Sequence, residues 1–406
     1  MESTAPAPPE RTETQGSPGP SVVLSKNGWK RWLSGHPWVF RDDLEAFDAE
    51  SGDCAAVLDF RGRELGRGFV STASKIALRV ATREAGAFDD RAFLLAKLER
   101  AAARRPKRNP NEAERLVSAE ADDLPGLIVD RYADVLCVQH AIPYWETRRE
   151  MLASVLRERF APRAIVSRDE FSARSLEGLP KRTEVVFGEN VGTVEIREGN
   201  VGFAVNPVAG QKTGFFLDQR DNRLKVAAHA RGSVLDMFCA DGSFALHCAK
   251  GGAEKVLGID SSAPALERAA ANAERNQLSE KVTWVRGMAF DELRARSEAG
   301  ERYDLVILDP PAFAKNRMEL TNAFRGYVEI NSRAMRLVAP GGILATFSCS
   351  YHMIEELFTK MLQEAASDCH RRVELLERLR QSMDHPIVLT HPESSYLKGA
   401  LLRIDS

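Results

Sequence analysis

Hydrophobic residues are distributed unevenly along the chain, and the first two parts that they define are a polar tail and a small β domain. Residues 1–20 are rich in Pro, Ser, Thr and Glu and have almost nothing apolar to bury, so we expect a disordered tail. Residues 21–85 carry short apolar segments separated by glycines, such as 55–59 and 76–80. Short runs of this kind predict strands, and together they indicate a small β-barrel.

The rest of the chain combines helical and strand patterns. Apolar residues form one stripe along residues 89–105, which predicts a helix, and a second helix is expected near residues 145–159. Apolar runs predict strands at 127–130, 135–140, 164–167 and 201–205. Residues 86–206 therefore read as a helix followed by a small α/β domain. From residue 207 to 406, strands and helices alternate, which is typical of an α/β domain on a parallel sheet.

Length, composition and charge limit the function classes. With 406 residues, 44% hydrophobic and 28% charged, the chain has the composition of a globular protein of two or three domains. Its net charge of −2 gives no general attraction to nucleic acid, so any RNA-binding surface must be local. No apolar run approaches the ~20 residues of a membrane span, and no signal core begins the chain. We therefore expect a cytoplasmic protein without membrane contact.

The cysteines give no sign of a disulfide framework or of a metal site. The 6 cysteines are scattered, and no pair has the spacing of a zinc clamp. A reducing compartment fits this usage. We expect no bound metal.

Two apolar strands are each followed by a reactive side chain. Residues 306–308 lead into Asp309 and two prolines, and residues 343–347 lead into Ser348, Cys349 and Ser350. Ligands and catalytic groups collect at such strand ends in open parallel sheets. Proline lacks a ladder donor and fixes φ, so the chain leaves the sheet on a stiff rim. The pattern predicts a site with a carboxylate and a thiol, although a lone cysteine is more often a buried, inert one.

A third strand end has the features of a nucleotide-type site. Residues 234–244 combine an apolar strand, a turn with Gly242 and the start of a helix. Such a turn brings backbone N–H groups to a ligand. The next strand ends in Asp260, where an acidic side chain can accept hydrogen bonds from a ribose, or alternatively cap the next helix. The turn has a single glycine, so the dinucleotide fingerprint is absent and a dehydrogenase is disfavoured.

These motifs resemble those of a known enzyme class. Residues 236–244, Asp260 and the Asp309-Pro310-Pro311 run resemble motifs I, II and IV of class I S-adenosylmethionine-dependent methyltransferases. The run 210–220 resembles the signature that precedes motif I in a bacterial family of 23S rRNA (cytosine-5)-methyltransferases with an N-terminal PUA domain. Further segments resemble that family at 35–40, 123–127, 384–386 and 396–399.

The resemblance implies a fold, a domain order and partners. The implied α/β fold has a Rossmann-like class I methyltransferase domain at 207–406. A PUA-like RNA-binding β-barrel at 21–85 and a helix with a small α/β linking domain at 86–206 precede it. The implied cofactor is S-adenosyl-L-methionine and the implied partner is 23S rRNA. A homodimer is compatible with the resemblance.

The implied reaction is methylation of cytosine at C5, and it places demands on two residues. Because C5 is a poor nucleophile, a thiolate must first add to C6. Cys349 stands where the similar enzymes carry that nucleophile, and Asp309 can hydrogen-bond or protonate N3 of the base. Ala312 stands where some RNA cytosine methyltransferases carry a second cysteine. The base that removes the C5 proton is therefore unassigned.

The resemblance also implies cofactor-binding residues. At Met288 the chain departs from the pattern, because similar enzymes usually place there an Asp that contacts the adenine amine. Helix capping and core packing are the alternative roles for Thr213 and Phe216. The expected cofactor-binding residues are Gln211, Lys212, Thr213, Phe216, Asp218, Arg220, Asp236, Phe238, Gly242, Asp260, Ser261, Met288 and Asp309.

Residues expected to bind RNA lie in the small β domain, at the end of the predicted helix and near the C-terminus. A basic cluster at a helix end is by itself more often a solvated surface, and an aromatic side chain in a barrel is more often core. With a PUA-like domain present, phosphate contacts become plausible. The expected RNA-binding residues are His36, Trp38, Arg104, Arg105, Lys107, Arg108 and Lys398.

Two other functions stay open at this point. The first is methylation of a purine amine or ring nitrogen, because motifs like Asp309-Pro310-Pro311 also occur in amino methyltransferases, where Cys349 would be dispensable. The second is a non-catalytic rRNA-binding assembly factor with a degenerate cofactor pocket, which Met288 and the single-glycine turn would suit.

Overall fold

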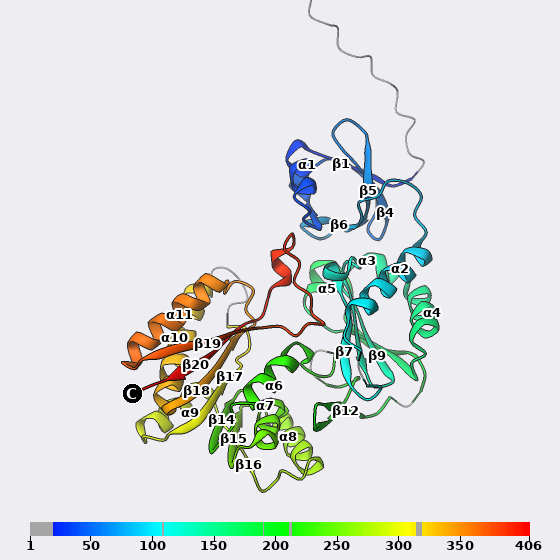
Figure 1. Cartoon of the computed structure of the whole chain (residues 1–406). Coiled ribbons are helices and arrows are strands. Elements are labelled where there is room, and N and C mark those ends of the chain that lie inside the picture. Colours follow the sequence, from blue (N-terminus) through cyan, green and yellow to red (C-terminus); the bar gives the residue numbers. More distant parts are fainter. Residues whose placement is uncertain (1–18, 108, 190, 211–212, 314–318) are drawn as a thin grey trace, which may run out of the picture.

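The computed structural model describes residues 19–406 except 108, 190, 211–212 and 314–318. Its N-terminal domain is built on one six-stranded sheet with the order β2-β6-β5-β4-β1-β3, and helix α1 packs beside it (Figure 1). This confirms the β domain that the short apolar runs predict. Its elements are β1 (Ser21–Leu24), α1 (Lys26–Leu33), β2 (Trp38–Phe40), β3 (Leu44–Asp48), β4 (Cys54–Leu58), β5 (Glu64–Val70) and β6 (Ile76–Thr82).

The middle domain has a five-stranded sheet with the order β11-β10-β9-β8-β7. Helix α2 begins beyond the N-cap Asp89, whose side chain accepts a hydrogen bond from the backbone N–H of Ala92, and it buries Leu94 and Leu98. The predicted helix and three of the predicted strands are confirmed. The elements are α2 (Asp90–Arg104), β7 (Ala113–Ser118), β8 (Leu127–Tyr132), β9 (Val135–His140), α3 (Pro143–Glu146), α4 (Arg149–Phe160), β10 (Ala164–Asp169), α5 (Ala173–Leu176) and β11 (Arg182–Phe187).

The fourth predicted strand forms a separate hairpin outside the middle sheet. Residues 201–205 do form strand β13 (Val201–Val205), but it pairs only with β12 (Val194–Glu198) in a separate hairpin. The apolar side chains of this hairpin, such as Ile196 and Phe203, join a core that contains Leu246 of the C-terminal domain and Val135 of the middle domain. The strand is thus outside the middle sheet but packs against both domains. An apolar pattern predicts that a strand is buried, but it does not predict which part of the protein covers the strand.

The C-terminal domain is a seven-stranded sheet with the order β16-β15-β14-β17-β18-β20-β19. The strands β14 to β18 are parallel, whereas β20 is antiparallel to both of its neighbours. Its strands are β14 (Ser233–Met237), β15 (Lys255–Asp260), β16 (Val282–Arg286), β17 (Tyr303–Leu308), β18 (Val338–Ser348), β19 (Val373–Arg380) and β20 (Lys398–Ile404). Its helices are α6 (Arg220–Ala227), α7 (Ser243–Gly251), α8 (Ala263–Arg275), α9 (Ala289–Glu298), α10 (Leu320–Leu337) and α11 (Glu355–Cys369).

Helices cover both faces of this sheet, so its central strands are apolar without alternation. In β17, Leu305 and Ile307 belong to the core that also contains residues of α7, while Val306 and Leu308 belong to the core beneath α10 and α11. Successive side chains of a strand point to opposite faces, so one apolar run serves two cores. The alternating α/β pattern predicted for this part of the chain is confirmed.

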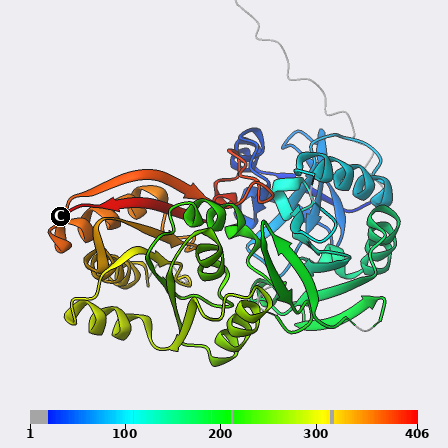
Figure 2. The same ribbon diagram turned by 60° about the horizontal axis from the view of Figure 1, so that its bottom comes forward.

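One long connection links the domains. Residues 381–397, here called the strap, leave the sheet after β19 and return at β20, and they contain a short 3-10 helix, η5 (Pro392–Ser394). In both views the strap reaches from the C-terminal sheet to the N-terminal and middle domains (Figures 1 and 2). There the ring of His391 lies 4.9 Å from the ring of Trp38, measured between centroids. The strap therefore contacts regions more than 300 residues away in sequence.

Candidate active site

The carboxyl ends of the parallel strands meet at a cavity of about 360 Å³. This size suits a small-molecule ligand, and the edge is the one where ligands bind in open α/β sheets. The lining residues are Phe216, Asp218, Gln219, Arg223, Phe238, Cys239, Ala240, Ser243, Phe244, Asp260, Ser261, Asp309, Pro310, Pro311, Ala312, Cys349 and Leu397.

The turn between β14 and α7 forms one wall of the cavity in an unusual backbone conformation. Phe238 and Ala240 have φ angles of 63° and 48°, in the left-handed region that non-glycine residues rarely occupy. Gly242 has a φ of 79°, and a Cβ atom there would lie 2.5 Å from the ring of Trp284. The carboxylate of Asp260 holds this turn by accepting hydrogen bonds from the backbone N–H of Ala240 (2.9 Å) and of Ser262 (2.8 Å). Such strain is typical of functional sites.

Asp236 lies beneath the turn and not in the cavity wall. Its carboxyl group is almost fully buried and accepts a hydrogen bond from the N–H of Ala245, in the first turn of α7, at 2.9 Å. Burial raises the pKa of Asp236 well above its usual value, and Asp309 and Asp260 add to the rise. Asp236 thus supports the turn from behind.

Asp309 and Cys349 both line the cavity from neighbouring parallel strands. Asp309 follows β17 directly, and its Oδ1 accepts a hydrogen bond of 3.0 Å from Nε2 of Gln219. Cys349 follows β18, and its Sγ donates toward the carbonyl oxygen of Pro310 at 4.0 Å. The predicted pairing of a carboxylate and a thiol at one edge of the sheet is therefore present in the structure.

Several of the expected cofactor-binding residues do line this cavity, and two form contacts elsewhere in the protein. The Oγ1 of Thr213 donates to Asp130 at 2.5 Å and lies 2.9 Å from the hydroxyl of Tyr132, so it joins its segment to the middle sheet. Arg220 is buried and pairs with Asp384 of the strap at 2.8 Å. Neither residue lines the cavity, so their roles in cofactor binding stay predictions. Those that line the cavity are Phe216, Asp218, Phe238, Asp260, Ser261, Asp309 and, as the expected nucleophile, Cys349.

Gly242 and Met288 lie outside the cavity wall. Gly242 shapes the turn, and Met288 is 61% exposed at the N-cap of α9. Gln211 and Lys212 fall outside the described residues.

Sequence reasoning missed Gln219, Arg223 and Leu397 as site residues. Gln219 stood within the recognised run 210–220, and its polar side chain was the available signal. Arg223 is buried and forms a two-point ion pair with Glu198 at 2.5 and 2.7 Å, a partner that no local pattern reveals. Leu397 comes from the end of the strap.

The residues expected to bind RNA divide into buried and exposed groups. His36 and Trp38 contact the strap and the middle domain: the Nε2 of His36 lies 3.3 Å from Glu393, and the indole N–H of Trp38 donates to Glu120 at 3.0 Å. Arg105 is buried and donates to Asp122, whereas Arg104 is partly exposed.

Three further expectations for RNA binding remain. Lys107 is exposed, but Lys398 is only 5% exposed. The expectation of surface RNA contacts is therefore corrected for Arg105 and Lys398, since both groups are enclosed by protein. Arg108 lies outside the described residues.

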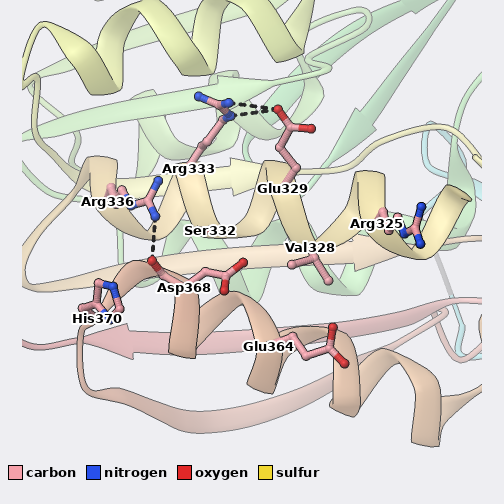
Figure 3. Close-up of a pocket in the computed structure, with 9 residues that line it drawn as sticks. All are labelled: Arg325, Val328, Glu329, Ser332, Arg333, Arg336, Glu364, Asp368 and His370. Atoms are coloured by element: carbon pink, nitrogen blue, oxygen red, sulfur yellow. Dashed lines mark hydrogen bonds and ion pairs between the residues drawn. The ribbon is translucent and has the colours of Figure 1, made fainter.

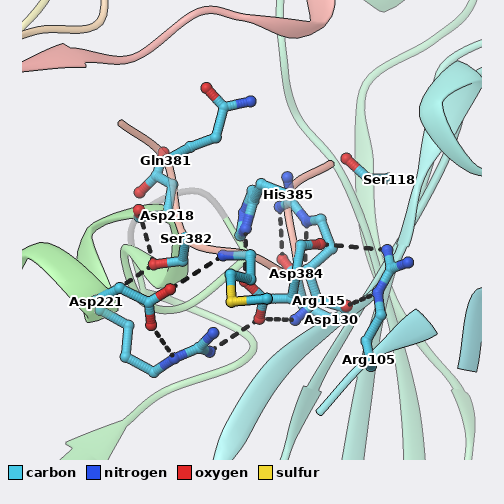
Figure 4. Close-up of polar contacts among 12 residues, drawn as sticks. Arg105, Arg115, Ser118, Asp130, Asp218, Asp221, Gln381, Ser382, Asp384 and His385 are labelled. Atoms are coloured by element: carbon cyan, nitrogen blue, oxygen red, sulfur yellow. Dashed lines mark hydrogen bonds and ion pairs between the residues drawn. The ribbon is translucent and has the colours of Figure 1, made fainter. Parts of the chain in front are cut away.

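Asp384 of the strap is the centre of a charged cluster between domains, here called the clasp (Figure 4). Its Oδ2 accepts from Arg220 at 2.8 Å and from the backbone N–H of Arg115 at 3.0 Å, and its backbone carbonyl accepts from Arg105. Burial opposes ionisation, but His385 and Arg220 outweigh it and hold the pKa of Asp384 well below its usual range.

The strap also holds one wall of the cavity. The hydroxyl of Tyr396 donates to Oδ2 of Asp218 at 2.9 Å, and the backbone N–H of Ser382 donates to the carbonyl of Asp218 at 2.8 Å. Domain contacts and the site therefore share one segment of the chain.

A second hollow, of about 470 Å³, lies between α10 and α11 (Figure 3). Two of its three lining guanidinium groups have partners in the protein: Arg333 pairs with Glu329 at 2.9 Å, and Arg336 donates to the carbonyl of Asp368 at 2.6 Å. It lies on helices and not at strand ends, so the cavity at the sheet edge is the better candidate.

Comparisons with known proteins agree with this geometry. A family model described as S-adenosylmethionine-dependent methyltransferase matches residues 175–403, and a PUA-like domain model matches residues 22–83. A ribosomal RNA large subunit methyltransferase I from Tolumonas auensis is 40% identical over 392 residues, which cover 94% of this chain and 99% of the relative. The chain belongs to this family of methyltransferases. A relative of the same name from Shewanella amazonensis is 41% identical and covers 91% of this chain and 95% of its own.

Solved structures support the fold of this methyltransferase. A structure of a Streptococcus mutans protein matches with a TM-score of 0.81 at 17% identity, covering 94% of this chain and 99% of its own. A second structure, of a protein complexed with SAH, gives a TM-score of 0.82 at 18% identity. The predicted Rossmann-like methyltransferase domain, preceded by a PUA-like domain, is confirmed. The protein is an S-adenosylmethionine-dependent rRNA methyltransferase, which sets aside the non-catalytic assembly factor.

The residues of the cavity suit this cofactor. S-adenosylmethionine carries a positive sulfonium and a positive ammonium group, and the cavity presents the carboxylates of Asp218, Asp260 and Asp309. Its one lining guanidinium, that of Arg223, is paired with Glu198. Within the described part of the chain, no cluster of side chains suits a metal ion and no helix is long and apolar enough to cross a membrane.

Proposed function

We propose that this methyltransferase acts on 23S rRNA and methylates C5 of a cytosine through a covalent bond between Cys349 and C6. The supporting observation is that the Cys349 thiol and the Asp309 carboxyl group line one cavity from adjacent strand ends. The names of the relatives, which denote large-subunit ribosomal RNA methyltransferases, support the choice of RNA.

The reaction assigns one task to each of the two side chains. The thiolate of Cys349 forms a bond to C6, while Asp309 hydrogen-bonds or protonates N3 and so stabilises the electron-rich ring. S-adenosylmethionine would supply an electrophilic methyl group: C5 forms a bond to it while the bond between the sulfonium sulfur and the methyl group breaks, and S-adenosylhomocysteine is the leaving group. Loss of the C5 proton restores the C5–C6 double bond and releases Sγ as a thiolate. Gln219 fixes Asp309 through their 3.0 Å hydrogen bond, which limits the positions that its carboxyl group can take.

The cofactor lies, in this proposal, between the strained turn and Asp260. The carboxylate of Asp260 accepts hydrogen bonds from the ribose hydroxyls, while its contacts with Ala240 and Ser262 keep it in position. Phe216, Phe238 and Ser261 line the same space. Asp218 is held by Tyr396 of the strap and supplies negative charge opposite the cationic part of the cofactor.

The RNA approaches from the N-terminal and middle domains. The PUA-like domain and the exposed groups of Arg104 and Lys107 are the RNA contacts that we propose, because His36 and Trp38 form contacts between domains and Arg105 is buried against Asp122. The homodimer stays a prediction.

The decisive experiment replaces the nucleophile. We expect Cys349→Ala to lower the formation of 5-methylcytidine in 23S rRNA by at least about 1,000-fold, as removal of a nucleophile does in other covalent enzymes. Nucleoside mass spectrometry after incubation with rRNA and S-adenosylmethionine measures this. The matched control is Cys54→Ala, a partly buried thiol in β4 whose pKa burial raises to about 12. Full activity of Cys349→Ala, with a methylated purine as product, would instead support the amino methyltransferase alternative.

A further inference from the structure

Lys398, the first residue of β20, is an enclosed lysine beside the proposed nucleophile. In the antiparallel pair of β18 and β20, Lys398 lies opposite Ser348, the residue before Cys349. Its side chain is only 5% exposed, and its Nζ donates to the backbone carbonyls of Ser350 (2.8 Å) and Tyr396 (2.9 Å). The bond to Ser350 holds the amino group at the loop that carries Cys349, and the bond to Tyr396 ties it to the strap.

The partners of Lys398 are unusual for a buried cation. A buried ammonium group is costly unless an anion faces it. In the described part of the chain no carboxylate lies within ion-pair distance of Nζ, in contrast to Arg220 and Arg223, which both have one. The groups that interact electrostatically with Lys398 are Cys349 and Glu355, both of which favour its charged form.

The other titratable groups around Cys349 do not help it to ionise. The cavity presents the carboxylates of Asp218 and Asp309, whose negative charge disfavours a second anion nearby. Tyr327 of α10 interacts with Cys349 and Asp309, and burial raises its pKa to about 12, so it stays neutral. Glu355 of α11 is exposed and pairs with Arg378 at 3.2 Å. A thiolate in these surroundings needs a cation close to it.

We propose that Lys398 is a positioning residue whose ammonium charge, held at the loop of Cys349, keeps the sulfur of Cys349 as a thiolate. The S–H bond of Cys349 breaks and the proton passes to solvent, while the ammonium group stays protonated. The same charge favours the thiolate again when Sγ leaves C6. This inference rests on the proposed role of Cys349 as the nucleophile.

The ionisation state of Lys398 suits this task. Burial lowers its pKa to about 8, against the opposing effect of Cys349 and Glu355. An amine with this pKa is mostly protonated at pH 7, where its charge favours ionisation of a nearby thiol, whose ordinary pKa is about 8.5.

The test measures the ionisation of Cys349 and not only the activity. Full-length protein is alkylated with iodoacetamide between pH 5.5 and 10, and the modified Cys349 peptide is quantified by mass spectrometry at each pH. We expect a midpoint below about 8.5 for the unchanged protein. In Lys398→Met we expect the midpoint to rise by at least one pH unit, which is a tenfold loss of thiolate near pH 7, whereas Lys398→Arg retains the charge and a low midpoint.

A matched control and a second readout complete the experiment. Lys360→Met removes an exposed lysine of α11 and should leave the midpoint unchanged. The methylation defect of Lys398→Met should diminish as the pH rises to about 9.5, because hydroxide then ionises the thiol without help. A purely structural lysine would show no such recovery.

Two results would overturn the inference. One is an unchanged Cys349 midpoint in Lys398→Met. The other is a midpoint of 8.5 or higher in the unchanged protein, which decides the matter even where the variant does not fold. Failure of the proposed function is seen separately, as full 5-methylcytidine formation by Cys349→Ala.

Discussion

The cavity at the sheet edge and the clasp around Asp384 both contain buried or half-buried carboxylates, but only the clasp has matching cations. In the clasp, Asp384 meets Arg220, and Asp130 meets Arg115 at 2.7 and 2.9 Å. At the cavity, no described cation forms an ion pair with Asp260, and none pairs with Asp236 beneath the turn. A carboxylate that is paired with a cation of the protein holds domains together. A carboxylate with no such cation beside it is available to a cationic ligand.

Replacing an aspartate by asparagine in each region tests this comparison. The largest loss of stability is expected in the clasp. Asp384→Asn leaves the buried guanidinium of Arg220 without its anion, so we expect the free energy of unfolding to fall by about 3 kcal/mol. Urea unfolding at pH 7 measures the loss. Asp48→Asn, on an exposed position of β3, is the matched control and should change stability by less than about 0.5 kcal/mol.

The pH dependence of the clasp gives an independent check. The pKa of Asp384 is depressed in the folded protein, so its stabilisation is complete above the unfolded value of about 3.9 and is lost as the pH falls through the folded value. The stability gap between Asp384→Asn and the unchanged protein should therefore be constant from pH 5 to 8. A gap that widens between pH 5 and 8 would show that another group carries the effect.

Asp260→Asn should have an intermediate effect, and on a different quantity. The substitution weakens a charge-assisted hydrogen bond to the cofactor, which is worth about 1.5–3 kcal/mol, so the affinity for S-adenosylmethionine should fall at least tenfold. Titration calorimetry measures it. The loss of stability should be smaller than that of Asp384→Asn. Asp291→Asn, an exposed residue of α9, serves as the control, and equal affinities of the two variants would remove Asp260 from the proposed ribose contact.

The contrast between the two regions also marks how far the sequence alone could lead. The rule that ligands bind at the carboxyl ends of parallel strands predicted Asp260, Asp309 and Cys349, because these ends meet at one edge of the sheet. Strand boundaries at 135–140 and 201–205 agreed with β9 and β13. These predictions depended on local patterns that carry their own geometry.

The clasp and the fate of individual cations could not be predicted in this way. Arg220 and Asp384 are 164 residues apart, and no local pattern connects them. Arg104 and Arg105 are identical neighbours, yet the first is partly exposed and the second is enclosed by Asp122, because the chain leaves the helix between them. Lys398 was expected on an RNA-binding surface, whereas its position opposite Ser348 follows from strand pairing. Composition shows how many charged residues the chain has, but not which of them pair in the folded protein.

Near pH 5, the smallest effect in this series is expected for Asp236→Asn, and its direction depends on pH. Burial raises the pKa of Asp236, so the stability that it contributes is fully present below the unfolded value of about 3.9 and declines as the pH rises through the folded value. An amide has the same shape without the charge and can still accept the hydrogen bond from Ala245. Near pH 5 we expect the two proteins to differ by less than about 1 kcal/mol.

With rising pH the balance should shift toward the variant, by roughly 1.4 kcal/mol for each unit by which the pKa of Asp236 is raised within the range tested. Thermal unfolding of Asp236→Asn and the unchanged protein from pH 5 to 9 measures this shift, with Asp48→Asn as the pH-independent reference. A stability gap that stays constant over this range would mean that Asp236 is ionised throughout. It would then resemble the carboxylates of the clasp, and the distinction between the two regions would fail at this residue.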